Sequence, residues 1–276
     1  MISVVIPVHN RRGLIGRAID SVLKQSFNDF EVIVVDDGSD DGTPQIVADR
    51  YGGEGRVRLL SQSSNRGVSA ARNAGIATAA GEWLAFLDSD DEWRPKKLDR
   101  QVRGLADSGL RVSHTNEIWI RNGVRVNPHK HHQKHGGRLF LKALPQCVMS
   151  PSSILLHRVV FNDVGPFDEN LPACEDYDLF LRLTCRYEVH YQDEELVIKY
   201  GGHADQLSRA HYAMDRFRIS ALERLLVESS AHLTEEERDA AVAMLLRKAR
   251  IVYNGALRHE NEQLAQIMSE FRQRWE

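Results

Sequence analysis

The sequence predicts an α/β protein with a mainly parallel sheet flanked by helices, followed by a C-terminal helical extension. Strand and helix signals alternate over about the first hundred residues, which is typical of right-handed βαβ units. Polar residues directly follow three of the expected strands. Beyond about residue 206, apolar residues recur at helical spacing.

Short apolar, β-branched runs predict the first strands, at residues 2–6, 31–35, 57–60 and 83–87. Apolar residues at helical spacing predict a helix at 15–23. Thr43-Pro44 is typical of a helix start and predicts a helix at 43–51, the alanine-rich residues 69–80 predict a third, and another is expected after Pro95. Residues 112–120 and 124–126 flank Asn122-Gly123 and predict a hairpin. Residues 175–186 are expected to be helical and 195–200 extended.

The C-terminal part is expected to be helical throughout. Thr234 and Glu237 form a capping box that opens one of its helices. Apolar stripes of this kind pack on the protein's own core or on a partner subunit, so a homodimer through these helices is left open. Glutamates dilute the arginines of the polar faces, which disfavours a membrane-surface helix. We therefore expect a catalytic domain at 1–205 and a helical extension at 206–276.

Composition excludes several classes of protein. Thirty-six Lys and Arg against 39 Asp and Glu give a net charge of −3, which argues against a nucleic-acid binder. Three scattered cysteines without a C-x-x-C pair are typical of reduced thiols in a cytosolic protein. The start has no basic leader, and no apolar run approaches the ~20 residues of a membrane-spanning helix. We therefore expect a soluble cytoplasmic protein.

Three polar clusters are expected on one edge of the sheet. They are His9-Asn10, Asp36-Asp37 and Asp88-Ser89-Asp90, and each follows a predicted strand. Any one of them alone would be an ordinary turn. Because ligands of such sheets bind beyond the carboxyl ends of the strands, the three together predict a site.

The acidic run Asp88-Ser89-Asp90-Asp91 is the strongest chemical signal. Carboxylate oxygens suit Mg²⁺ or Mn²⁺. A cation held by one or two carboxylates and a substrate diphosphate would neutralise charge on a departing phosphate. The alternative is an acidic loop that caps the helix after Pro95, a role expected of Asp91 in particular.

Five ordered blocks make the chain resemble the family 2 glycosyltransferases over about residues 1–205. The blocks are residues 4–10, 34–43, 65–75, 86–91 and 175–178. The resemblance implies the GT-A fold, a nucleotide-sugar donor and a divalent metal. It places the nucleotide- and donor-binding positions on Pro7, Val8, His9, Asn10, Asp37, Asn65, Gly67, Arg72, Asp88 and Ser89.

The same resemblance implies individual roles. His9 stands where the family usually has a tyrosine, against the nucleotide pocket. Asp37 would hydrogen-bond the base, usually uracil, and Arg72 would lie near the base and diphosphate, where its planar fork suits phosphate. Asp88 would touch ribose or metal, and Asp90 would be the main metal ligand. For Asp37 a turn role, and for Arg72 a solvated helix position, remain the alternatives.

Glu175-Asp176 forms the second constellation. By resemblance, Asp176 is the general base for the acceptor hydroxyl, and Glu175 holds acceptor or sugar hydroxyls. Both are alternatively first-turn acids favoured by the helix dipole. His203 would be a third metal or diphosphate ligand, or part of a glycine-rich turn. The His- and Lys-rich residues 127–135 are expected to form a loop near the acceptor or diphosphate.

These signals together predict an inverting, metal-dependent glycosyltransferase with a UDP-linked donor favoured. By resemblance, the acceptor is a bacterial surface glycan or its lipid-linked precursor, so peripheral contact with the inner face of the membrane is left open. One alternative is a nucleotidyltransferase that makes sugar nucleotides, although the first strand is not followed by a glycine-rich phosphate loop. Another is a non-catalytic nucleotide-sugar-binding protein, disfavoured by the presence of Glu175-Asp176. A dehydrogenase is disfavoured because no G-x-G-x-x-G follows the first strand.

Overall fold

One mixed sheet organises the computed structural model, which describes residues 1–126, 133–202 and 212–275. Within these residues the sheet has nine strands in the order β3-β2-β1-β4-β8-β6-β9-β5, and β7 pairs with β6 off this path. The strands are β1 (Ile2–Val8), β2 (Phe30–Asp36), β3 (Val57–Ser61), β4 (Trp83–Phe86), β5 (Glu92–Trp93), β6 (Val112–Arg121), β7 (Val124–Val126), β8 (Ile154–His157) and β9 (His190–Gly201).

The predicted parallel arrangement describes the N-terminal half of the sheet. There β1 pairs in parallel with β2 and β4, and β2 with β3. Farther on, β8 runs antiparallel to both β4 and β6, while β6 and β9 are parallel. The α/β class is confirmed, and the whole sheet is mixed. The predicted hairpin joins β6 to β7, with positive φ at Asn122 and Gly123, as its tight turn requires.

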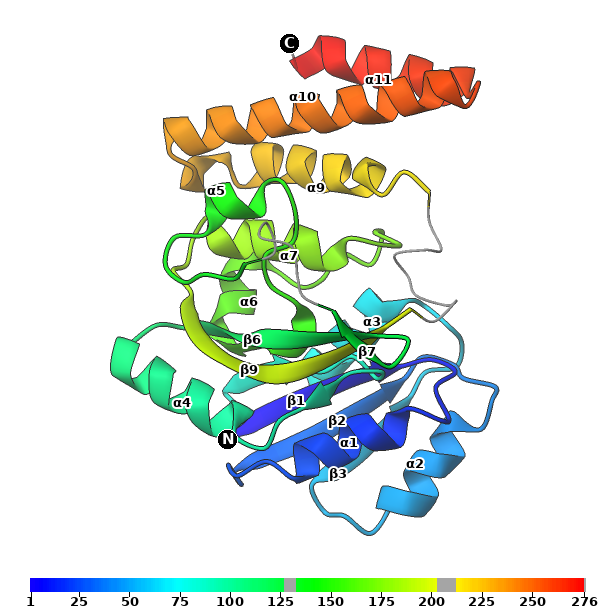
Figure 1. The fold of residues 1–276 in the computed structure, drawn as a ribbon, viewed down its shortest axis with the longest axis vertical. Helices are drawn as coiled ribbons and strands as arrows, with labels where there is room; N and C mark the ends of the chain where they lie inside the picture. Colours follow the sequence, from blue (N-terminus) through cyan, green and yellow to red (C-terminus); the bar gives the residue numbers. More distant parts are fainter. Residues whose placement is uncertain (127–132, 203–211, 276) are drawn as a thin grey trace.

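The helices lie on both faces of the sheet and stack beyond it at one end (Figure 1). They are α1 (Ile15–Leu23), α2 (Thr43–Tyr51), α3 (Val68–Thr78), α4 (Lys97–Ser108), α5 (Phe140–Ala143), α6 (Val159–Val164), α7 (Glu175–Thr184), α9 (Asp215–Glu228), α10 (Glu235–Arg258) and α11 (Glu262–Trp275).

Alternate side chains of β1 enter two different cores, because successive residues of a strand point to opposite faces. Val4 and Ile6 pack with apolar residues of α1, α2 and α4. Val5 packs on the other face with residues of α3, α6 and α7. There α3 lies so close that a Cβ at Gly75 would be 2.3 Å from a methyl of Val5. Glycine at this position therefore brings α3 against the centre of the sheet.

The C-terminal helices share a third core with α7. Tyr177 and Leu181 of α7 pack with Leu222 of α9 and Leu245 of α10, and α11 packs on α10 (Figure 1). The predicted capping box opens α10, with Thr234 Oγ1 accepting from the Glu237 N–H at 3.2 Å. The predicted domain boundary at 205/206 falls in residues 203–211, outside the described residues.

Candidate active site

The polar clusters meet at one edge of the sheet, as predicted. Val8 is paired with Asp36, so β1 and β2 end side by side, and β4 ends beside β1. The turn after β2 also approaches the loop before α3. Gly38, with φ +70°, lies so close to the Ser64 backbone that a Cβ would be 2.6 Å from its carbonyl carbon. The residues after β1, β2 and β4 and the loop before α3 therefore form one rim.

Asp37 organises the first side of this rim. Its carboxylate accepts the backbone N–H groups of Arg66 and Gly67, each at 2.8 Å. Asn65 Oδ1 also accepts from the Gly67 N–H at 3.0 Å. His9 Nδ1 lies 2.9 Å from the Asp37 carbonyl oxygen, which accepts its proton. Hydrogen bonds thus connect four of the predicted nucleotide-binding residues, His9, Asp37, Asn65 and Gly67.

The end of β1 and the residues that follow it lie beside the same loops. Pro7 and Val8 are buried at the end of the strand. Asn10, at φ +51°, receives a bond from the Asp40 N–H on its Oδ1 at 3.0 Å. Its own N–H donates to Ser39 Oγ at 2.8 Å. In the free protein Asn10 therefore positions the turn after β2.

Arg72 is buried at the centre of the site. From α3, its Nη2 donates to Asp88 Oδ1 at 2.8 Å and its Nη1 to Glu175 Oε1 at 2.6 Å. Only 3% of the residue is exposed. Burial disfavours its charge, but the carboxylates of Asp88 and Glu175 outweigh that effect and raise the pKa of Arg72. Arg72 therefore ties the acidic turn after β4 to α7, and it is not a solvated helix residue.

The two carboxylates that Arg72 bonds, Asp88 and Glu175, have pKa values shifted in opposite directions. Burial would raise the pKa of Asp88, but the charges of Arg72 and Lys199 hold it below its ordinary value. For Glu175, burial dominates and Asp176 adds repulsion, so the pKa of Glu175 is raised in spite of Arg72. The neighbouring positive charges therefore decide the direction of the pKa shift for Asp88, and burial decides it for Glu175.

The rest of the acidic turn divides into two parts. Ser89 and Asp90 are half-buried, and the Asp90 carbonyl oxygen accepts a hydrogen bond from Arg17. Asp91 is buried and does not cap α4, which corrects that expectation. Its Oδ2 accepts from Ser152 Oγ at 2.7 Å and its Oδ1 from the Tyr200 N–H at 3.3 Å. Burial raises the pKa of Asp91 to about 8, against the opposing charge of Lys199.

The N-terminus of α7 presents the second constellation. Cys174 precedes it in a left-handed conformation, with φ 64°, which is strained for a residue with a Cβ. Asp176 is half-exposed, its Oδ1 accepts from the Tyr177 N–H at 2.7 Å, and Cys147 Sγ lies 3.5 Å from its Oδ2. Glu175 and Asp176 are indeed first-turn acids, and Arg72 also brings them beside the acidic turn.

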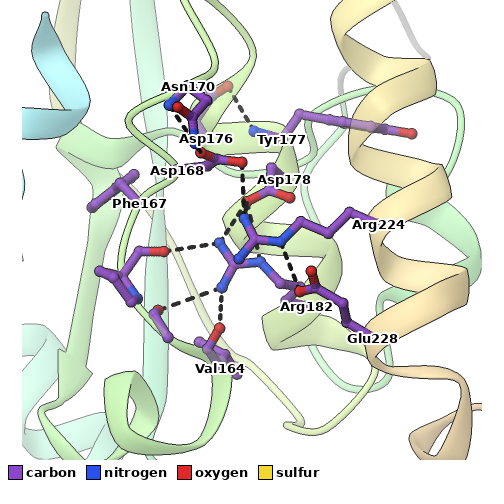
Figure 2. A network of polar contacts seen from close by, with 12 residues as sticks. Val164, Phe167, Asp168, Asn170, Asp176, Tyr177, Asp178, Arg182, Arg224 and Glu228 are labelled. Carbon is purple, nitrogen blue, oxygen red and sulfur yellow. Dashed lines mark hydrogen bonds and ion pairs between the residues drawn. The ribbon is translucent and has the colours of Figure 1, made fainter.

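A network of hydrogen bonds and ion pairs holds α7 in place (Figure 2). Asp178 Oδ2 accepts from Arg182 Nη2 at 2.5 Å, and Arg182 also donates to backbone carbonyls of residues 164–166. Arg224 reaches in from α9, 3.0 Å from Asp168 and 3.6 Å from Asp178. The helix that carries Glu175 and Asp176 is therefore tied to a neighbouring loop and to α9.

Sequence reasoning missed a buried charge cluster beside the site. Glu117 on β6 accepts from Lys134 Nζ at 2.8 Å, Ser150 Oγ at 2.7 Å and Trp119 Nε1 at 2.7 Å. Lys134 was expected in a cationic loop, and instead it is buried with Glu117. Burial opposes the charge of Glu117, but Lys134 and Lys199 lower its pKa to about 2. No local motif signals this cluster, because its members meet only through the sheet.

Two expectations concern residues that the structure does not describe. His203, the predicted third ligand, lies outside the described residues, as do positions 127–132 of the His- and Lys-rich tract. Within the described ranges, no three His, Cys, Asp or Glu side chains gather into a metal-binding group.

Comparison with known proteins identifies the family. The sequence profile described as glycosyl transferase family 2 matches residues 3–165, and a second profile, glycosyltransferase-like family 2, matches residues 140–231. The chain belongs to glycosyl transferase family 2. The range that the first profile matches contains His9, Asp37, Arg72 and Asp88.

Several relatives in this family have curated names. The chain is 31% identical over 183 residues to the Escherichia coli protein named UDP-Glc:alpha-D-GlcNAc-diphosphoundecaprenol beta-1,3-glucosyltransferase WfgD, covering 66% of this chain and 69% of that protein. It is 30% identical over 195 residues to an uncharacterized glycosyltransferase of Rickettsia felis, covering 71% of this chain. The chain spans only 32% of the length of that Rickettsia relative.

Solved structures share the fold of this family 2 chain. The S. aureus TarS 1-349 structure in complex with UDP-GlcNAc superposes with a TM-score of 0.67 at 21% identity, covering 99% of this chain and 91% of that one. The fold is therefore of the GT-A type, and its C-terminal helices belong to the superposed part. Within the described residues, every helix is too short or too polar to cross a membrane.

Proposed function

We propose that the chain is an inverting glycosyltransferase that moves a sugar from a nucleotide diphosphate sugar, with a UDP-linked donor favoured, to an acceptor hydroxyl. The observation that carries the proposal is Arg72, bonded at once to Asp88 and Glu175. Because of this bridge, a donor seated on the acidic turn would have its sugar beside Asp176. Family membership and the UDP-glucose donor in the name of WfgD support the proposal.

The nucleotide would lie along His9, Asp37, Asn65 and Gly67. The backbone N–H groups of Arg66 and Gly67 occupy one lone pair on each Asp37 carboxylate oxygen. Each oxygen keeps a further lone pair, so the carboxylate would accept the imide N–H of uracil. Asn10 would keep the adjoining turn in place.

Asp88 and Asp90 would hold Mg²⁺ or Mn²⁺ together with the donor's diphosphate. The residues fit such a cation, because both are hard oxygen donors on one turn. Arg72 already bonds Oδ1 of Asp88, so the cation would share this carboxylate with Arg72. When bound, the cation neutralises charge on the diphosphate. His203 stays a proposal for a further ligand.

Asp176 would take the proton of the acceptor hydroxyl. The hydroxyl oxygen attacks the anomeric carbon on the face opposite the diphosphate, so the configuration inverts. General-base catalysis of this kind contributes about 10²–10⁴-fold. Glu175, fixed by Arg72, would orient sugar or acceptor hydroxyls, and the N–H of Tyr177 keeps Asp176 Oδ1 in place.

The acceptor is proposed to be a bacterial surface glycan or its lipid-linked precursor. The name of WfgD includes a diphosphoundecaprenol-linked acceptor, which supports the second choice. Such an acceptor would bring the enzyme to the inner face of the membrane as a peripheral cytoplasmic protein. A homodimer through α9–α11 stays a prediction, to be tested by light scattering in solution.

The products distinguish this proposal from its alternatives. Purified protein is incubated with Mn²⁺ and a panel of nucleotide sugars, with and without acceptors, and in parallel with nucleoside triphosphates and sugar phosphates. We expect metal-dependent release of a nucleoside diphosphate. Release of pyrophosphate from a triphosphate would indicate a nucleotidyltransferase, and binding without any turnover would indicate a sensor.

A further inference from the structure

Lys199 lies at the site without a role in the transfer described above. It stands on β9, paired in register with Trp119 of β6, and its neighbour Tyr200 donates to Asp91. Its Nζ is 3.9 Å from Asp91 Oδ2. This part of β9 therefore joins the acidic turn, which lies almost 110 residues earlier in the chain.

The ammonium of Lys199 has N–H groups that can donate hydrogen bonds to a ligand. A separation of 3.9 Å is too long for a hydrogen bond, and the oxygens of Asp91 already accept from Ser152 and Tyr200. In the described part of the chain, Asp91 is the one ion-pair partner that Lys199 has. An ammonium carries three N–H donors, and 30% of the side chain is exposed. Lys199 is therefore accessible to an anionic ligand.

The surrounding charges keep this ammonium protonated. Burial would lower the pKa of Lys199, but the carboxylates of Asp91, Glu117, Asp88 and Asp176 outweigh it and raise that pKa. Asp88 and Asp91 belong to the acidic turn, Asp176 to the start of α7 and Glu117 to β6. Arg72, by contrast, is already bonded to two carboxylates.

We propose that Lys199 binds the diphosphate of the donor and stabilises the nucleoside diphosphate as it leaves, an inference that rests on the proposed function. In the transfer, the acceptor oxygen bonds to the anomeric carbon and its proton passes to Asp176. The bond from that carbon to the β-phosphate oxygen breaks, and its electron pair stays with the diphosphate. This charge develops between the acidic turn and α7, where a cation positioned in advance stabilises it.

The competing role for Lys199 is to offset the buried carboxylates without touching the donor. The two roles differ in their dependence on the second phosphate. UDP and UMP, each with Mn²⁺, are titrated calorimetrically into the wild type, Lys199→Met and Lys199→Arg. Release of the nucleoside diphosphate is then timed with the nucleotide sugar that the wild type uses.

We expect Lys199→Met to lose about tenfold or more in affinity for UDP, while its affinity for UMP changes less than about twofold. The rate of diphosphate release should fall about 10²-fold, because one preorganised charge is lost. Lys199→Arg should recover much of the UDP affinity. If Lys199→Met does not fold, Lys199→Gln, which keeps an N–H donor but no charge, replaces it in the same comparison.

Lys248→Met is the matched control. It also removes a partly buried ammonium, one that bonds Pro145 and Asp215 under α10, and it should bind UDP as the wild type does. A folded Lys199→Met with wild-type UDP affinity and release rate would overturn the inference alone, as would equal losses for UDP and UMP. A wild type that binds neither nucleotide would overturn the proposed function and the inference together.

Discussion

Arg72 links two separate elements of the candidate site through one side chain. Its two terminal nitrogens bond carboxylates from elements that are far apart in the sequence, the turn after β4 and α7. A lysine could not reproduce this geometry, because its ammonium is a point charge and lacks the planar fork of a guanidinium. The residue therefore holds the acidic turn after β4 beside the N-terminus of α7.

Replacing Arg72 by Met should lower the free energy of unfolding by about 3 kcal/mol, because two carboxylates lose their buried partner. Arg72→Lys should lose about half as much. Urea unfolding measures both. Arg66→Met is the control: Arg66 pairs with Glu169 on the surface, so its loss should stay under about 1 kcal/mol. Equal small losses for Arg66 and Arg72 would contradict the bridging role.

His114 should make stability depend on pH. Its Nε2 donates to the His135 carbonyl at 2.7 Å, and burial together with the charge of Lys134 lowers its pKa to about 3. Because the folded pKa is below the ordinary 6.5, this contribution is complete above pH 6.5 and is lost as pH falls towards 3. Between pH 7.5 and 5 the loss should be about 2 kcal/mol. We measure the free energy of unfolding by denaturant at several pH values. In His114→Gln it should fall by about 2 kcal/mol less between pH 7.5 and 5 than in the wild type. An unchanged pH dependence would refute this role of His114.

Sequence motifs predicted the site residues that stand close together in the sequence. They missed the residues that only the folded sheet brings to the site. Asp37, Asp88 and Asp176 stand in recognisable blocks. Asp37 and Asp88 lie at the predicted rim, and Asp176 lies in the first turn of α7, next to the Glu175 that Arg72 joins to Asp88. Lys199 looks like an ordinary strand lysine until β9 is placed beside the acidic turn. Asp91 was expected to cap a nearby helix, but its carboxylate bonds Ser152 and Tyr200, which are far from it in the sequence.

The element that decides the site is α7. Its N-terminal turn carries Glu175 and Asp176, its apolar faces fill two cores, and Arg182 anchors it to the preceding loop. The proposed base, Asp176, would thus be carried by a helix that a buried ion pair between Asp178 and Arg182 holds in place. This rigidity suits a proton acceptor, which must stay within hydrogen-bond reach of the acceptor hydroxyl.

Arg182→Met should destabilise the protein by about 3 kcal/mol, because the buried Asp178 would lose its hydrogen-bonded partner and keep only the longer contact with Arg224. Arg224→Met, which touches the same carboxylate from a more exposed position, should cost about 1 kcal/mol or less. Thermal melts of the two variants give the comparison. If Arg224→Met proved as damaging as Arg182→Met, the network would have to be reassigned.

Elements with a local signal were predictable from the sequence. Apolar spacing predicted α1 and the C-terminal helices, cap, proline and alanine signals predicted α2–α4, and the structure has each of them. By contrast β8, with four residues, and the short helices α5 and α6 give no periodic signal of their own. Because β8 was not foreseen, neither was the antiparallel half of the sheet.

The whole molecule is joined through a core that spans its expected boundary. The apolar residues of α7 pack against α9 and α10, so the C-terminal helices cover part of the catalytic half. We therefore expect one cooperative thermal transition for the full chain in calorimetry, and aggregation of a chain that ends at residue 205. Two separate transitions would show that the halves fold independently.

The central claim, that one rim unites donor binding with a base on α7, is tested most directly by separating binding from transfer. In Asp176→Asn, we measure the affinity for the nucleotide sugar by calorimetry and the rate of transfer under saturating donor and Mn²⁺. The account predicts donor affinity within about threefold of the wild type and a rate lower by about 10²–10⁴-fold. Transfer at the wild-type rate in this variant would contradict it.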